Sequence, residues 1–285
     1  MRLIERTDLV NEGDGRVPSN WQDKYKLLQF ARRGRVLTVT MNSPKNLNAV
    51  GPQMHDELSQ VFTDLAIDDG SDIIVLTGAG RAFSAGGDID HMQAVVDDPT
   101  LFLHEAEGSR RLVFSLLELE KPIVAKINGH AVGLGATLAL LCDITFMSTN
   151  ARIGDPHVNV GLVAGDGGAV IWPHLVGFAK AKEFLLTGDL IDAAKAEKIG
   201  LVNYAIEPDR LDVAVDAFCD RLATGATHAI RWTKNIVNLE LKRIASSVMH
   251  AGMAYETVSV QSLDHAEAVA AFREKRPPVF GKSRK

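Results

Sequence analysis

The spacing of hydrophobic and polar positions changes along the chain, and these changes divide it into predicted elements. Two short runs rich in β-formers, "YKLLQF" (25–30) and "RVLTVTMN" (35–42), flank a glycine-containing link, which predicts a β-hairpin. Apolar residues then recur three and four positions apart across residues 52–67. This period is typical of an amphipathic helix with one face toward a core.

The middle of the chain alternates between two kinds of apolar segment. Short apolar runs bounded by turn residues predict buried strands at 72–78, 122–129 and 143–149. Longer patterns predict helices at about 100–118 and at 134–142. Strands and helices that alternate in this way favour an α/β core with both faces of the sheet covered.

Beyond about residue 208 the alternation stops. Three helical stretches, 209–223, 228–249 and 255–275, follow one another without an intervening strand. We therefore divide the chain into a loosely ordered N-terminal arm (1–24), an α/β core (25–206) and a helical C-terminal region expected to mediate oligomerisation (207–285).

Composition narrows the classes of protein. The chain has 285 residues, 46% of them hydrophobic, and a net charge of −5, so no broad basic surface indicates a nucleic-acid partner. The N-terminus lacks the apolar stretch of a signal peptide, and no apolar run is long enough to span a membrane. Cys142 and Cys219 have no CxxC partner and are expected to be buried thiols. We expect a cytoplasmic protein.

Glycine-rich segments follow two of the predicted strands. The first, "AGRAFSAGGDID" (79–90), is predicted to be a long loop, and Phe83 occupies the third glycine position of a dinucleotide fingerprint. Small residues at 84–87 would let backbone N–H groups approach a ligand. In the second segment, Gly133 and Gly135 lie where a helix begins, and the first turn of a helix leaves N–H groups unpaired. Two such openings could direct two N–H donors at one oxygen, as in an oxyanion hole.

Several short motifs occur in one order along the chain: "NSPKNLNAV" (42–50), "GAGRAFSAGGDI" (78–89), "KPIVAKINGHAVGLG" (121–135), "CDITF" (142–146), "GLVAGDGG" (161–168) and "AFREKRPPVF" (271–280). In this order the sequence resembles the crotonase superfamily, the enoyl-CoA hydratase/isomerase family. The resemblance implies a spiral of ββα units with a helical C-terminal trimerisation region. It also implies an acyl-CoA substrate, no further cofactor or metal, and a homotrimer or a dimer of trimers.

The resemblance also assigns roles to individual positions. The two oxyanion-hole N–H groups match Gly87 and Leu134. The residues that match CoA-binding positions are Gly87, Asp88, Ile89, Asp90, Phe272 and Lys275. Coenzyme A would enter as part of the substrate, with the Lys275 ammonium able to meet its phosphates.

Three positions depart from the hydratase pattern or stand out within it. The two glutamates that flank the activated water in a hydratase of this family are replaced by Thr137 and His157. Asp166 lies in a glycine-rich turn expected beside the acyl group, where a carboxylate could remove a proton or attack carbon. Asp166, His157 and Thr137 are therefore the candidate catalytic residues. The simpler alternatives are a turn-forming aspartate, a structural histidine and a packed threonine.

The sequence thus predicts an acyl-CoA enzyme of the hydratase/isomerase type. Three alternatives remain. The protein could be an enzyme that uses Asp166 and His157 for hydrolysis or C–C bond chemistry, or it could bind acyl-CoA without catalysis. The incomplete glycine fingerprint also leaves open a nicotinamide-dependent enzyme. The sequence does not define the acyl group.

Overall fold

The computed structural model describes residues 21–281, and most of the predicted N-terminal arm lies outside this range. The chain enters the fold through a short 3-10 helix, η1 (Trp21–Lys24). Trp21 is buried and its ring meets the rings of Tyr25 and Phe30 at centroid distances of 5.9 and 5.0 Å. Within the last four residues of the predicted arm, which form η1, Trp21 therefore packs against the core.

Ten strands form two sheets in the described part of the chain. The larger sheet has the order β1-β2-β3-β5-β7-β10, and only β1 runs antiparallel to its neighbour. Its strands are β1 (Leu28–Arg33), β2 (Val36–Met41), β3 (Ile73–Gly78), β5 (Ile123–Ile127), β7 (Ile144–Ser148) and β10 (Tyr204–Ile206). The smaller sheet has the order β4-β6-β8-β9, with β4 (Ala82–Ser84), β6 (His130–Val132), β8 (Arg152–Gly154) and β9 (Ile191–Asp192).

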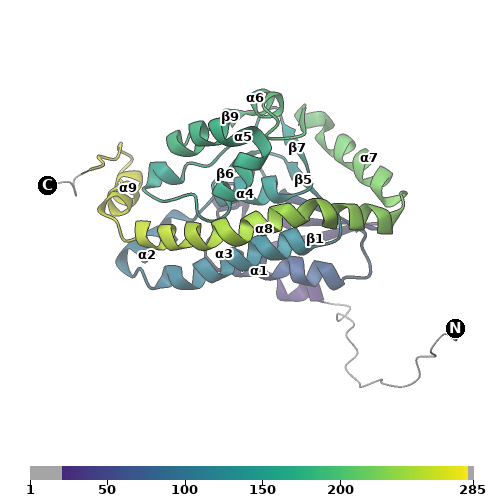
Figure 1. Cartoon of the computed structure of the whole chain (residues 1–285), viewed down its shortest axis with the longest axis horizontal. Helices are drawn as coiled ribbons and strands as arrows, with labels where there is room; N and C mark the ends of the chain where they lie inside the picture. The colour runs from purple at the N-terminus through teal and green to yellow at the C-terminus, as the bar shows by residue number, and fades with distance from the viewer. Residues whose placement is uncertain (1–20, 282–285) are drawn as a thin grey trace, which may run out of the picture.

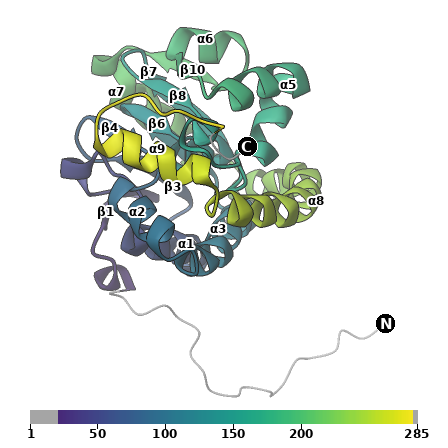
Figure 2. The same cartoon turned by 90° about the vertical axis from the view of Figure 1, so that its left-hand side faces the viewer.

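Helices cover both sides of the larger sheet (Figures 1 and 2). The principal helices are α1 (Pro52–Ile67), α2 (Ile89–Asp97), α3 (Leu101–Glu118), α4 (Leu134–Leu141), α5 (Gly168–Thr187), α6 (Ala193–Lys198), α7 (Leu211–Ala223), α8 (Thr227–Ser259) and α9 (Leu263–Arg273). On one side α1 packs against α3, and α3 packs against α8. On the other, Leu211 and Val215 of α7 form a hydrophobic cluster with Val124 of β5.

Successive passes of the chain place a strand in each sheet and then a helix. β3 and β4 precede α2 and α3, β5 and β6 precede α4, and β7 and β8 precede α5. This is the predicted spiral of ββα units, followed by α7, α8 and α9 as the predicted helical C-terminal region. The predicted α/β class is confirmed.

Two predicted boundaries differ from the structure. The segment 79–90 is not one long loop, because it contains β4 and the start of α2, whose N-cap Asp88 accepts hydrogen bonds from the amides of Asp90 and His91. A three-residue strand is too short to show a period, which explains why the pattern missed it. The predicted break between 249 and 255 is also absent, because α8 continues as one helix to Ser259.

The helices of residues 21–281 include none that combines the length and the apolar character required to cross a lipid bilayer.

Candidate active site

The site lies at the carboxyl ends of three neighbouring strands. β4, β6 and β8 are adjacent and parallel in the smaller sheet, so their carboxyl ends share one edge. Gly86 and Gly87 follow β4, Gly133 and Leu134 follow β6, and the segment 155–157 follows β8. Ligands of open parallel sheets bind at this end of the strands. The fold therefore brings together segments that are about fifty and twenty positions apart in the sequence.

The loops after β4 and β6 touch through their backbones. Gly86 has a φ of 85°, and a Cβ atom there would lie 2.8 Å from the carbonyl oxygen of Val132. The same atom would lie 3.7 Å from Cα of Gly133, whose own φ is 53°. Glycine is needed at both positions because each has a left-handed backbone and Gly86 also has no room for a side chain. The contact holds residues 87 and 134 close to one another.

Backbone pairing sets the direction of the Gly87 amide. The amide of Val50 donates to Gly86 O at 2.7 Å, and that of Asp88 donates to Val50 O at 3.2 Å. Because successive amides of an extended chain point to opposite sides, the Gly87 N–H points away from Val50. Leu134 is the first residue of α4, so its N–H has no acceptor within the helix. Gly87 and Leu134 both line one inner cavity.

Two connected hollows meet at Gly87, Asp88, Met92 and His157, which line both. The inner cavity has a volume of about 80 Å³ and the outer one about 500 Å³. The predicted CoA-binding residues that line the outer hollow are Gly87, Asp88, Ile89, Asp90 and Phe272. Lys275 is exposed and is not among the lining residues.

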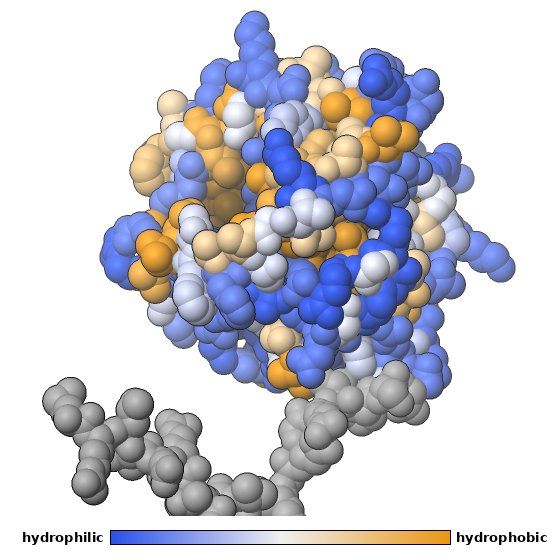
Figure 3. All heavy atoms as spheres, turned by 90° about the vertical axis from the view of Figure 1, so that its right-hand side faces the viewer, coloured by the Kyte–Doolittle hydropathy of each residue, from blue (hydrophilic) through white to orange (hydrophobic). Residues whose placement is uncertain are grey.

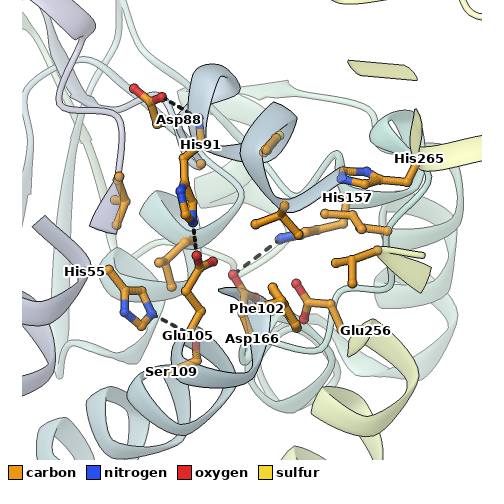
Figure 4. Close-up of a pocket in the computed structure, with 18 residues that line it drawn as sticks. His55, Asp88, His91, Phe102, Glu105, Ser109, His157, Asp166, Glu256 and His265 are labelled. Carbon is orange, nitrogen blue, oxygen red and sulfur yellow. Dashed lines mark hydrogen bonds and ion pairs between the residues drawn. The ribbon is translucent and has the colours of Figure 1, made fainter. Parts of the chain in front are cut away.

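The imidazole of His157 lies between the carboxylates of Asp155 and Asp166 at the wall of the inner cavity, and Figure 4 shows its contact with Asp166. Its Nδ1 contacts Oδ1 of Asp155, and its Nε2 lies 3.5 Å from Oδ2 of Asp166. Thr137 is fully buried on α4 and donates a hydrogen bond of 3.3 Å to Oδ1 of Asp166. The structure therefore brings the three candidate catalytic residues together, and adds Asp155.

A second buried acid reaches the same cavity from a distant helix. Glu256 of α8 is 4% exposed and lines the inner cavity with Asp166 and His157. Its Oε2 has no hydrogen-bond partner among the described residues. That oxygen lies against Gly165, where a Cβ atom would be 2.7 Å away. The glycine before Asp166 thus leaves room for a carboxyl group from another part of the chain.

The close packing of these groups shifts their proton affinities. Burial raises the pKa of Asp166 and raises that of Glu256 well above its ordinary value, while the charge of His157 opposes both shifts. Burial would lower the pKa of His157, but the charges of Asp155 and Asp166 outweigh it and raise the pKa well above the ordinary value. The two carboxylates therefore favour the protonated form of the His157 ring. Such coupled groups exchange protons as one unit.

Asp155, His157 and Asp166 also offer ligand atoms within 4.8 Å of one another, which is a spacing compatible with a metal ion. Each ring nitrogen of His157 already faces a carboxylate, however, on opposite sides of the imidazole. A metal ligand needs a free, deprotonated nitrogen. The arrangement fits an imidazolium held by two acids better than a metal centre.

Comparison with known proteins places this geometry in context. The model of the family described as "Enoyl-CoA hydratase/isomerase" matches residues 31–283. The chain belongs to the enoyl-CoA hydratase/isomerase family.

Individual relatives agree with this assignment. A "Probable enoyl-CoA hydratase" of Rhizobium meliloti is 34% identical over 260 residues, covering 90% of this chain and 98% of that protein. A "Short-chain-enoyl-CoA hydratase" of Clostridium acetobutylicum is 34% identical over 256 residues, covering 86% and 94%. The crystal structure of an enoyl-CoA hydratase/isomerase from Mycobacterium paratuberculosis superposes with a TM-score of 0.82 at 34% identity, covering 86% of this chain and 97% of that one.

In this member of the enoyl-CoA hydratase/isomerase family, sequence reasoning missed four residues of the site: Asp155, which contacts His157, and Lys45, Arg81 and Glu256. Lys45 and Arg81 are exposed cations that line the outer hollow, and Glu256 lines the inner cavity. Each cation lies inside one of the quoted motifs, Lys45 in 42–50 and Arg81 in 78–89, so its position next to a predicted ligand-binding loop was a usable signal. Glu256 carried no such signal, because a glutamate on a long, polar helix usually faces solvent.

Proposed function

We propose that the chain acts on an acyl-CoA thioester and that the N–H groups of Gly87 and Leu134 donate to the thioester oxygen. The supporting observation is that two backbone loops touch at Gly86 and Gly133 and present the next residue of each to one cavity. Negative charge that develops on the oxygen during the reaction would be stabilised there. Each such donor contributes about 2.7–4 kcal/mol to the transition state.

The outer hollow is proposed to hold coenzyme A. Its wall carries the cations Lys45 and Arg81, which suit phosphate groups, and the exposed ring of Phe272, which offers a surface for a base or a pantetheine chain. The inner cavity continues from Gly87 and His157 and would receive the acyl group. The thioester would lie at the junction, where the two amides are.

His157 and Asp166 are proposed as the acid and the base. An imidazolium can donate a proton, and a neighbouring carboxylate can accept one, so the pair suits proton transfer at the α or β carbon. Asp155 would fix the ring through Nδ1, and Thr137 would orient Asp166. Lyase or isomerase chemistry on an enoyl-CoA follows from such an arrangement.

One observation favours a second candidate. An imidazole held by a carboxylate at Nδ1 resembles the oriented base of hydrolases, so hydrolysis or cleavage of a C–C bond by His157 and Asp166 remains the alternative reaction. A non-catalytic binder is less consistent with the site, because burying Asp155, Asp166 and Glu256 around one imidazole is costly and gives a binder nothing.

The substitution Asp166→Asn tests the proposal. The amide keeps the shape and can still accept the hydrogen bond from Thr137, so binding of an acyl-CoA should persist while kcat falls about 10²–10⁴-fold. Asp212→Asn is the control, since Asp212 is exposed and pairs with Lys126 outside the two hollows. Unchanged turnover in Asp166→Asn would remove this residue from the mechanism.

The reaction itself is best identified by mass spectrometry of a panel of acyl-CoA thioesters after incubation with the enzyme. A gain of one water indicates hydration, loss of CoA indicates hydrolysis, and an unchanged mass with altered absorbance indicates a shifted double bond. The absence of any conversion and of any binding across the panel would contradict the acyl-CoA assignment.

A further inference from the structure

The inner cavity contains a second group of polar side chains, apart from His157, Asp166 and Glu256. This group comprises His55 of α1, His91 of α2, and Glu105 and Ser109 of α3, and Figure 4 shows them together. The ring of His91 contacts the carboxyl of Glu105 through Nε2, and His55 Nε2 lies 3.0 Å from Ser109 Oγ. We call these four residues the distal polar group. The proposed mechanism at the thioester uses none of them.

The same helices also supply apolar residues to the cavity. Met92 and Val95 of α2 and Phe102 of α3 line it alongside the distal polar group. An apolar acyl chain would be best served by apolar side chains throughout. The side chains of His91 and Glu105 are partly exposed, at 16% and 20%, and a histidine–carboxylate contact that solvent reaches contributes little to stability. Stability alone therefore gives no reason for His91 and Glu105 at this wall.

The position of the group along α3 sets its distance from the thioester end. A Cβ atom at Gly167, next to Asp166, would lie 3.3 Å from Val113 on α3. Ser109 and Glu105 lie one and two turns before Val113, about 6 and 12 Å along the helix axis. Ser109 and Glu105 therefore lie one to two helical turns along α3 from the turn that holds Asp166, so the distal polar group lines a different part of the cavity wall from Asp166.

We propose that the inner cavity selects an acyl group that carries an uncharged oxygen function, a carbonyl or a hydroxyl, several carbons from the thioester, and that His91 and Glu105 recognise this oxygen. This inference rests on the proposed acyl-CoA function and names the substrate class. A carbonyl or hydroxyl oxygen can accept a hydrogen bond from the pair, and a hydroxyl can also donate one.

The electrostatics of the pair support an uncharged ligand. Burial raises the pKa of Glu105 to about 7, so a large share of this carboxyl stays protonated near neutral pH, and burial lowers the pKa of His91, which favours the neutral ring. Neighbouring charges affect these pKa values less than burial does. His104 lowers and Asp56 raises the pKa of Glu105, and Asp88 raises the pKa of His91. A carboxylate on the substrate would find no cation here, and an ammonium would meet a carboxyl that is ionised only in part, whereas a neutral oxygen needs only the hydrogen bond.

The test compares two CoA esters that differ only at the distal position, hexanoyl-CoA and 5-oxohexanoyl-CoA. Isothermal titration calorimetry measures both dissociation constants, and mass spectrometry checks that the esters stay intact. We expect the oxo ester to bind about three- to tenfold more tightly, the range for one neutral hydrogen bond. In His91→Phe and in Glu105→Leu this ratio should fall to about one.

A purely structural role of the pair, tying α2 to α3, would change the affinity for both esters equally and leave their ratio intact. His104→Phe is the matched control, because His104 lies on α3 beside Glu105 but its side chain is 80% exposed and pairs with Asp56. Should the apolar variants fail to fold, as judged by thermal unfolding, His91→Gln and Glu105→Gln replace them and should retain part of the selectivity.

Equal affinity of the wild-type protein for the two esters would overturn the distal recognition while leaving the acyl-CoA function in place. A ratio that stays at its full wild-type value in the variants at both positions, whether apolar or Gln, would do the same. Failure of the wild-type protein to bind either ester would overturn the proposed function together with this inference.

Discussion

At the scale of single residues, the site is built around an imidazole with an acid at each ring nitrogen. Asp155 contacts Nδ1 of His157 and Asp166 lies 3.5 Å from Nε2. Only one of these partners is local in sequence. The carboxylates favour the protonated ring more strongly than burial disfavours it, which supports the proposed role of His157 as the acid.

This arrangement predicts a bell-shaped pH profile of kcat/KM. Activity should fall at low pH when Asp166 becomes protonated and at high pH when His157 loses its proton. Because both pKa values are raised, both limbs should lie above the ordinary values of about 3.9 for aspartate and about 6.5 for histidine. In His157→Gln the alkaline limb should disappear and the rate should drop about 10²–10⁴-fold. An alkaline limb that persists in this variant contradicts the assignment.

Glu256 offers a prediction about stability. Its pKa is raised in the folded protein, so the folded state binds more protons than the unfolded state between the two pKa values. The free energy of unfolding should therefore fall as pH rises above about 4.3, the ordinary glutamate value. Glu256→Gln should remove this loss, so the stability of the variant relative to the wild type should be higher at pH 8 than at pH 4.

Denaturant titrations of the wild type and of Glu256→Gln at pH 4 and pH 8 measure this difference. Glu240→Gln is the control, since Glu240 lies on the same helix but its side chain is 64% exposed. A variant that loses stability equally at both pH values would show that the carboxyl is not penalised by ionisation in the fold.

At the scale of elements, the contact between the loops after β4 and β6 fixes the distance between the two proposed donors. Gly86→Ala should push the loops apart, because its Cβ would lie 2.8 Å from Val132 O. We expect a loss of about 1–3 kcal/mol in stability and a fall in kcat of tenfold or more.

Gly34→Ala is the matched control for Gly86→Ala. Gly34 also has a positive φ, of 59°, but a Cβ there meets no atom within 4 Å. This control should lose stability through backbone strain and keep its turnover. Equal turnover in the two variants would argue that the spacing of the loops is irrelevant to the reaction.

Local patterns defined most elements, and the exceptions have physical causes. The helix at 52–67 was predicted to the residue, because its apolar face is continuous over four turns. β4, β6 and β8 have three residues each, too few for a period, although they carry the site. The family motifs located the two glycine loops, Asp166 and His157. Glu256 and the distal polar group reach the same cavity only through the packing of α1, α2, α3 and α8, which no local sequence pattern encodes.

At the scale of the whole molecule, α8 carries large hydrophobic side chains that no described residue covers. Examples are Trp232, Ile236, Val237, Tyr255 and Val258, each more than half exposed. The face at the right of Figure 1, drawn in Figure 3, shows hydrophobic patches among hydrophilic residues. We propose, as the family resemblance implies, that copies of this chain assemble as a trimer or a dimer of trimers.

The substitution Ile236→Lys tests this assembly. A charge placed in a contact between copies should shift the mass measured by light scattering toward that of a monomer, because burying an unpaired ammonium is costly. Val213→Lys, at an equally exposed apolar position on α7, is the control. An unchanged mass in both variants, or a monomeric wild type, would exclude α8 from the interface.

The length of α8 has a consequence for such experiments. One uninterrupted rod of 33 residues, roughly 50 Å long, carries the exposed Trp232 and Ile236 toward one end and the buried Glu256 at the other. If a second copy of the chain tilts the end of α8 that carries Trp232 and Ile236, the position of Glu256 in the inner cavity should change as well. Turnover should therefore be measured together with the molecular mass of the assembly for every substitution on α8, because this helix contributes to both the proposed contact between copies and the inner cavity.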